Sequence, residues 1–226
     1  MLRNLDIGLS QANRQLVAMA GLVEEAIIAA THAWRQRSTA RIQEVYAIEQ
    51  RVNQAHIEVD SECVKLLALQ QPMATDLRQI ISLIKINTDL ERMVDLAVNI
   101  AQNTEYFLKS PPVISTEDLS DMSDEVRVMV REALDAFVQK DERLARSVLL
   151  RDDKVDQYKR KIFDDVLAAM RRDPACIEQG LNVILIAKNL ERVGDHATNV
   201  GEDVIYMSSG KDVRHSGGAS PGVTRR

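Results

Sequence analysis

Residues 190–199 read LERVGDHATN, and residues 90–99 read LERMVDLAVN. Leu, Glu, Arg, Asp, Ala and Asn recur at the same spacing in the two stretches. Apolar residues return every three or four positions through both, which is the pattern of an amphipathic helix. The chain is therefore expected to contain two copies of one helical unit, and each copy presents the same set of polar side chains.

The same apolar periodicity predicts six helices, three in each copy. They are expected over residues 5–37, 39–70, 75–109, from 115–118 to about 139, 142–172 and 174–207. Pro72, Pro111 and Pro112 lie between them, and Pro174 is expected at the first position of the last helix, where the lack of an amide donor does no harm. The predicted fold class is all-α, a tandem pair of three-helix antiparallel bundles. The expected units are 1–112 and 113–208, and the Gly- and Ser-rich residues 209–226 are expected to be a disordered tail.

Bulk composition excludes several classes of protein. The net charge is −5 and no basic cluster is present, so nucleic-acid binding is not expected. Cys63 and Cys176 are far apart and lack CxxC spacing, which favours two buried, reduced thiols. No signal peptide is recognised, and no apolar stretch is judged long enough to span a membrane. The sequence predicts a cytoplasmic protein that reaches a membrane only through partners.

Polar side chains form a stripe on the last helix of each unit. At 100° per residue, Glu191, Asp195, Asn199 and Glu202 lie roughly opposite the apolar stripe. Gly194 and Gly201 lie beside the apolar stripe, where a neighbouring helix can approach closely. Oxygen donors of this kind suit hard cations such as Mg²⁺, Ca²⁺, Mn²⁺ or iron. A solvated polar face is the alternative, because like charges four residues apart destabilise a helix slightly.

The preceding helix of each unit adds further oxygen donors at matching positions. Asp152 and Asp156 stand four residues apart in the second unit, and Glu49 and Asn53 take the same places in the first. The metal could be of the Fe, Zn, Mn, Mg or Ca type. The candidate metal ligands are Glu49, Glu91, Asp95, Asp152, Asp156, Glu191, Asp195, Asn199 and Glu202.

Enzymatic motifs are absent from the sequence. A ferritin-like di-iron bundle requires Glu-x-x-His on two helices, and no such pattern occurs. No P-loop, Gly-rich dinucleotide turn or nucleophile–His–acid arrangement is found. His196 has no counterpart at Leu96 and is expected to be a packing residue. Trp34 and Phe137 occupy equivalent places and are expected to lie in the core. The protein is not expected to be an enzyme.

The doubled motif, with Gly194-Asp195-His196 in its second copy, resembles that of the PhoU family. So does the segment 67–78, LALQQPMATDLR, and the resemblance extends over about residues 3–208. It implies two three-helix bundles, often dimeric, that bind metal through Glu/Asp-x-x-x-Asp motifs. It also implies a negative regulator of phosphate uptake and signalling. Such regulators link the phosphate ABC transporter, through its ATPase subunit, to the sensor histidine kinase of the phosphate regulon.

The first unit departs from the family pattern. Asn53 replaces an acid, and Gln102 stands where the second unit has Glu202. Fewer negative charges weaken cation binding, so we predict two inequivalent sites, the tighter at Glu191 and Asp195. The expected function is a non-enzymatic, metal-binding adaptor that forms a homodimer. A metal-dependent or metal-storage helical bundle is the alternative, and a purely structural helical repeat is a third.

Overall fold

The computed structural model describes residues 3–109 and 114–214, and every regular element in these ranges is a helix. The family-typical all-α fold predicted above is confirmed, and each helix boundary lies within a few residues of its expected position. The elements are α1 (Asn4–Arg35), α2 (Thr39–Gln70), α3 (Thr75–Phe107), α4 (Glu117–Gln139), α5 (Glu142–Arg172), the short 3₁₀ helix η1 (Pro174–Cys176) and α6 (Ile177–Ser209).

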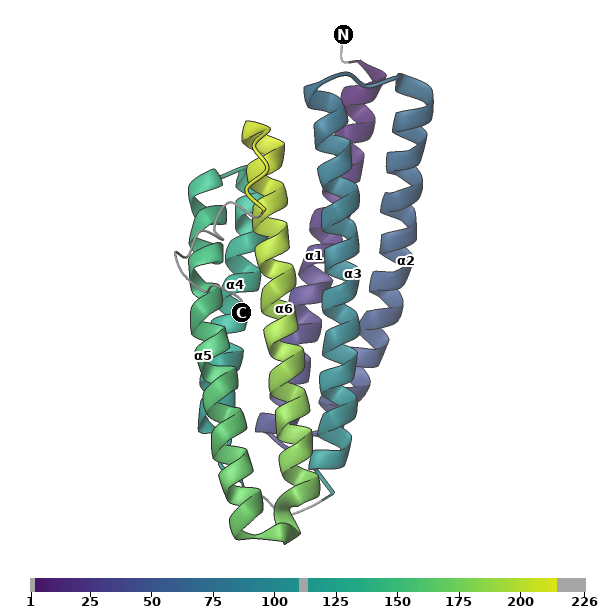
Figure 1. Cartoon of the computed structure of the whole chain (residues 1–226). Helices are drawn as coiled ribbons and strands as arrows, with labels where there is room; N and C mark the ends of the chain where they lie inside the picture. The colour runs from purple at the N-terminus through teal and green to yellow at the C-terminus, as the bar shows by residue number, and fades with distance from the viewer. Residues whose placement is uncertain (1–2, 110–113, 215–226) are drawn as a thin grey trace, which may run out of the picture.

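The helices form two three-helix bundles that lie side by side (Figure 1). Helices α1, α2 and α3 pack against one another, as do α4, α5 and α6. The bundles join where α3 packs against α6 and α1 packs against α4. In Figure 1 the α2–α3 turn is at the top, whereas η1, between α5 and α6, is at the bottom. Helices α3 and α6 are therefore antiparallel neighbours. The predicted boundary between the units, at residues 112 and 113, lies outside the described residues.

The side chains expected in the core are buried. Trp34 and Phe137 are each 3% exposed. Cys63 and Cys176 are free thiols, and both are buried. Burial raises the pKa of the Cys63 thiol to about 11, with a further contribution from the charges of Asp60 and Glu62. The Cys63 thiol is therefore protonated and unreactive at neutral pH.

Helix α1 is more apolar than we predicted. By length and composition alone it could cross a membrane, although it lies near the N-terminus and 56% of its most apolar window is buried in the structure. The expectation that no stretch reaches this threshold was wrong. A helix that packs against two others in a bundle core needs the same apolar composition.

The C-terminal segment differs from the expected disordered tail at its start. Ser209 is the last residue of α6, and Gly210 ends the helix with φ +72°. Val213 packs against the core, and Arg214 forms a 2.8 Å ion pair with the nearly buried Asp203. These contacts hold residues 209–214 against α6. Residues 215–226 lie outside the described part of the chain.

Gly201 allows α5 to approach α6 closely. A Cβ at this position would lie 3.1 Å from the Ala145 carbonyl oxygen and 3.0 Å from a Leu149 methyl carbon. At Gly194 the nearest atoms would be 3.7 Å away, which is an ordinary contact. The close approach expected at both glycines therefore holds only for Gly201.

We predict that Gly201→Val lowers the free energy of unfolding by about 1–3 kcal/mol, because the α5 backbone must move to admit the side chain. The matched control is Gly21→Val in α1, where an added Cβ meets no atom within 4 Å. The control is expected to change stability little, since Val is a somewhat better helix former than Gly. Urea unfolding followed by circular dichroism measures both, and equal losses would contradict the prediction.

Glu125 joins α4 to α5. Its carboxylate is 8% exposed and lies 2.7 Å from Arg151 Nη1 and 2.5 Å from Lys154 Nζ. Burial acts to raise the pKa of Glu125, but the hydrogen bonds from Lys154 and Arg151 outweigh it and the pKa is lowered. The ion pairs therefore stabilise the fold above the usual pKa of 4.5.

Replacing Glu125 with Gln is expected to lower the free energy of unfolding by about 1–3 kcal/mol at neutral pH. The stabilisation by the carboxylate is lost as the pH falls from about 4.5 through the lowered folded-state pKa. The difference between the unmutated protein and Glu125→Gln must therefore shrink in acid. Urea unfolding at neutral and acidic pH tests this, and a difference that stays constant would refute the assignment.

Candidate metal-binding face

Four of the predicted ligands form a carboxylate cluster where α5 packs against α6. Asp152 and Asp156 come from α5, and Glu191 and Asp195 come from α6. The pKa of Asp152 is raised to about 6, first by burial and then by the negative charges of Asp195, Asp156, Asp153 and Glu191. The sequence placed these pairs on different helices without showing that they meet. In the structure their charges act on one another.

Lys159 supplies a positive charge to this cluster. Its Nζ lies 2.5 Å from Glu191 Oε1, and the Glu191 side chain is only 17% exposed. The hydrogen bond to Glu191 raises the pKa of Lys159. The pKa of Asp195 is nevertheless raised, first by partial desolvation and then by the charge of Glu191. One ammonium therefore faces four carboxylates, and the cluster keeps an excess of negative charge.

Asn199 and Glu202 do not belong to this cluster. Asn199 donates a 3.1 Å hydrogen bond to Asp89 Oδ1 on α3, and His196 Nδ1 lies 2.7 Å from the same oxygen. Glu202 lines a cavity of about 310 Å³ between α3 and α6 together with Asp203. The expected stripe winds around α6, because a step of four residues turns slightly more than one full turn. Its last two residues, Asn199 and Glu202, therefore lie on the side of α6 that faces α3. Their role as metal ligands stays a prediction, and the structure places them toward α3 rather than toward α5.

The matching acids of the first unit have partners close by in the chain. Arg92 lies 3.4 Å from Glu91 and 3.3 Å from Asp95. Asn53 donates a 2.5 Å hydrogen bond to Glu49 within α2. The predicted difference in cation affinity between the two units therefore has a second cause, besides the number of acids. Both units carry an arginine next to the first acid of the motif, but Arg92 pairs with both acids on α3, whereas in the second unit Lys159 of the preceding helix pairs with Glu191.

The donor chemistry of the cluster on α5 and α6 fits a hard cation. All four side chains are carboxylates, and a cation would relieve the mutual repulsion that helps to raise the pKa of Asp152. Within residues 3–109 and 114–214, however, no three His, Cys, Asp or Glu side chains converge as a ready coordination shell. Binding would require Lys159 to leave Glu191 and the carboxylates to rotate.

The contact between α3 and α6 is a site that the sequence did not predict. Asp203 is almost fully buried there, and burial raises its pKa against the opposing charges of Lys85 and Arg214. A signal was present in the sequence, because the two copies differ in polarity where the units meet. The differing pairs are Lys85 and Leu185, Asp89 and Asn189, Leu96 and His196, and Asn103 and Asp203.

Comparison with known proteins identifies both halves of the chain. A family model described as the PhoU domain matches residues 16–104 and again residues 119–204. A relative from Pseudomonas putida, a phosphate-specific transport system accessory protein PhoU homolog, is 39% identical over 212 residues. The alignment covers 92% of this chain and 82% of that protein.

Solved structures agree with the sequence relatives. The crystal structure of PhoU from Pseudomonas aeruginosa is 36% identical, with a TM-score of 0.90 over 92% of this chain and 100% of that one. The phosphate transport system regulatory protein PhoU from Streptococcus pneumoniae is 26% identical, with a TM-score of 0.85 over 93% of this chain and 99% of that one. The two domain matches fall on the two three-helix bundles. The chain therefore belongs to the PhoU family.

Proposed function

We propose that this protein is a non-enzymatic negative regulator of phosphate uptake and phosphate-regulon signalling in the cytoplasm. The observation that carries the proposal is the pair of PhoU-domain matches, which together span most of both bundles. Relatives that cover nearly the whole chain are named accessory proteins of the phosphate-specific transport system. An accessory protein acts by binding, which agrees with the absence of enzymatic motifs from the sequence.

The proposed partners are the ATPase subunit of the phosphate ABC transporter and the sensor histidine kinase of the phosphate regulon. Two similar bundles with differently charged faces suit an adaptor that must contact two proteins. The chain carries a net charge of −5, so control of genes would pass through the kinase rather than through binding to DNA. We also propose that the protein acts as a homodimer and that it meets the membrane only through these partners.

We further propose that the carboxylate cluster of the second unit binds a hard cation of the Fe, Mn, Mg, Ca or Zn type. Asp152 and Asp156 would approach it from α5, and Glu191 and Asp195 from α6. A bound cation would supply positive charge that neutralises these side chains and ties α5 to α6. In the present structure the ammonium of Lys159 supplies the positive charge next to Glu191. Glu49, Glu91 and Asp95 would form the weaker site.

Deleting the gene tests the regulatory function. If the proposal is right, phosphate-starvation genes are expressed constitutively in cells grown with abundant phosphate, and a plasmid copy of the full chain restores repression. The physical reason is that the kinase then receives no signal from a transporter that is saturated with phosphate. Reporter expression from a phosphate-starvation promoter measures the outcome. Normal repression in the deletion strain would reject the proposal.

A further inference from the structure

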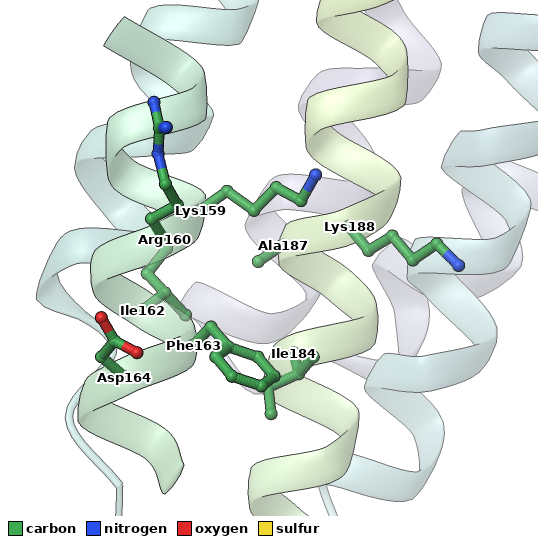
Figure 2. Close-up of a pocket in the computed structure, with 8 residues that line it drawn as sticks. All are labelled: Lys159, Arg160, Ile162, Phe163, Asp164, Ile184, Ala187 and Lys188. Atoms are coloured by element: carbon green, nitrogen blue, oxygen red, sulfur yellow. The ribbon is translucent and has the colours of Figure 1, made fainter. Parts of the chain in front are cut away.

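An apolar groove opens between α5 and α6, next to the carboxylate cluster. It has a volume of about 560 Å³, within the range of ligand-binding pockets. Its walls include Ile162 and Phe163 from α5 and Ile184 and Ala187 from α6. Figure 2 shows Phe163 and Ile184 facing each other across the gap, with Ala187 directed toward α5.

Basic side chains border this groove. Lys159 extends from α5 toward α6 in Figure 2, and Arg160 runs upward along α5. Lys188 also lines the groove, at the rim formed by α6, and its side chain projects away from α5. The single acid in the lining, Asp164, points away from α6. Lys188 is exposed. A mostly cationic border is unusual for a chain with a net charge of −5.

The residues at the matching place of the first unit are more polar. Ala187 corresponds to Asn87, whose buried side chain donates a 3.0 Å hydrogen bond to the His56 carbonyl oxygen. This side chain fills the gap between α2 and α3. Phe163 corresponds to the charged Asp60. The apolar lining of the groove is therefore not repeated in the first unit.

The apolar surface continues beyond the groove along α6. Ile177, Leu181, Ile184 and Lys188 follow one another at steps of four, three and four residues, so they share one face of the helix. Leu181 is 52% exposed and Phe163 is 48% exposed. The apolar part of the stripe, from Ile177 to Ile184, is about 10 Å long at 1.5 Å per residue, and Lys188 lies one turn beyond it. That length matches a docked helix with anchors at i, i+3 or i+4 and i+7.

We propose that this face of α5 and α6 docks an acidic amphipathic helix of a partner protein. Apolar side chains of that helix would enter between Phe163 and Ile184, and its Asp or Glu side chains would meet Arg160 and Lys188. The argument rests on charge complementarity and on the length of the apolar stripe. The proposal deepens the proposed adaptor function, on which it rests, by naming the surface through which one partner is held.

Lys159 connects this docking face to the carboxylate cluster. Its ammonium lies on Glu191, while its stem lines the groove. An acidic side chain in the groove would compete with Glu191 for this ammonium. Docking and the charge state of the cluster are thereby coupled through one side chain.

Site-specific photo-crosslinking in cells tests the docking face. A photo-reactive phenylalanine analogue replaces Phe163 in the full chain, and mass spectrometry identifies the captured segment. The expected result is capture of a partner segment with apolar residues at helical spacing and flanking acids. The matched control places the analogue at Ile57, which is exposed on α2 and corresponds to Arg160. Capture of only a second copy of this chain, capture of only lipid, or no capture at all would overturn the proposal.

A binding measurement with the purified, captured partner completes the test. Phe163→Glu places a negative charge against an acidic helix and is expected to weaken binding at least about tenfold, or about 1.4 kcal/mol. Ile57→Glu is expected to leave binding unchanged. Both side chains are exposed, so both variants should keep the helical circular dichroism and the thermal midpoint of the unmutated protein. Unchanged binding by a folded Phe163→Glu variant would also overturn the proposal.

The outcomes separate this proposal from the regulatory function. Suppose that deleting the gene derepresses phosphate-starvation genes, while a strain that carries the Phe163→Glu variant represses them normally and the variant still binds its partners. The proposed docking face is then rejected, and the proposed regulatory function is kept. If deletion leaves repression intact, the regulatory function is wrong, while the crosslink at residue 163 still decides whether an acidic helix docks on α5 and α6.

Discussion

Asp195→Ala weakens the binding of Mn²⁺ at least about tenfold, whereas Asp95→Ala has a smaller effect; this is the result we expect from the two bundles. Asp195 belongs to a cluster in which four carboxylates face one ammonium. Removing it deletes both an oxygen donor and a negative charge. Asp95 already lies 3.3 Å from Arg92, which competes with any cation.

Isothermal titration of Mn²⁺ into the purified full chain measures the two affinities. Asp153→Ala is a useful third variant, because Asp153 is exposed on α5 and contributes charge to Asp152 without being a proposed ligand. It should reduce affinity less than Asp195→Ala does. Equal losses from Asp195→Ala and Asp95→Ala would show that the units are equivalent. Absence of Mn²⁺ binding by the unmutated protein would remove this metal from the candidates.

The second large effect concerns the core. Trp34→Ala is expected to lower the free energy of unfolding by about 3–5 kcal/mol, because it removes a large side chain that is 3% exposed and leaves a cavity. The guanidinium of Arg35 lies 5.5 Å from the centroid of the Trp34 ring. Arg35 also binds Ser123 and Asp124 on α4. Loss of the indole should therefore loosen the contact between α1 and α4 as well as the first bundle.

Trp34→Phe is the matched control, and the repeat itself justifies it. Phe137 holds the equivalent place in the second unit and is equally buried. Within the described chain the indole nitrogen of Trp34 has no hydrogen-bond partner, so phenylalanine loses no such bond. The control should cost less than about 1.5 kcal/mol. Urea unfolding followed by circular dichroism compares the variants, and similar losses from Ala and Phe would contradict this account of the core.

The helices themselves could be predicted because their causes are local. Apolar residues at steps of three and four define one buried face, prolines at 72, 111 and 112 separate the predicted helices, and Pro174 stands at a helix start. The second half of the sequence aligns with the first, so the apolar pattern of each helix is supported by that of its counterpart in the other half. Membrane-spanning potential was misjudged for α1, because a fully packed helix of a bundle and a spanning helix share their composition.

The candidate site could be predicted only in part. The repeat located Glu191 and Asp195, and spacing within α5 located Asp152 and Asp156. Helical phasing placed Glu191 and Asp195 opposite the apolar stripe and left open whether that face is solvated or binds metal. In the structure, α5 and α6 bring the four side chains together, and partial burial with mutual repulsion raises the pKa of Asp152 to about 6. Local spacing contains no information about the distance between two helices.

By itself the sequence determined six helices, their grouping into two related bundles, and the surplus of acids in the second. These follow from the 3.6-residue period and from comparing one copy with the other. Only the tertiary structure decided that α3 packs against α6, because that contact joins residues more than a hundred positions apart. It turned Asn199 and His196 toward Asp89, away from the carboxylate cluster. One helix can present several faces of similar polarity. The neighbouring helix that packs against a face decides what the side chains on that face do.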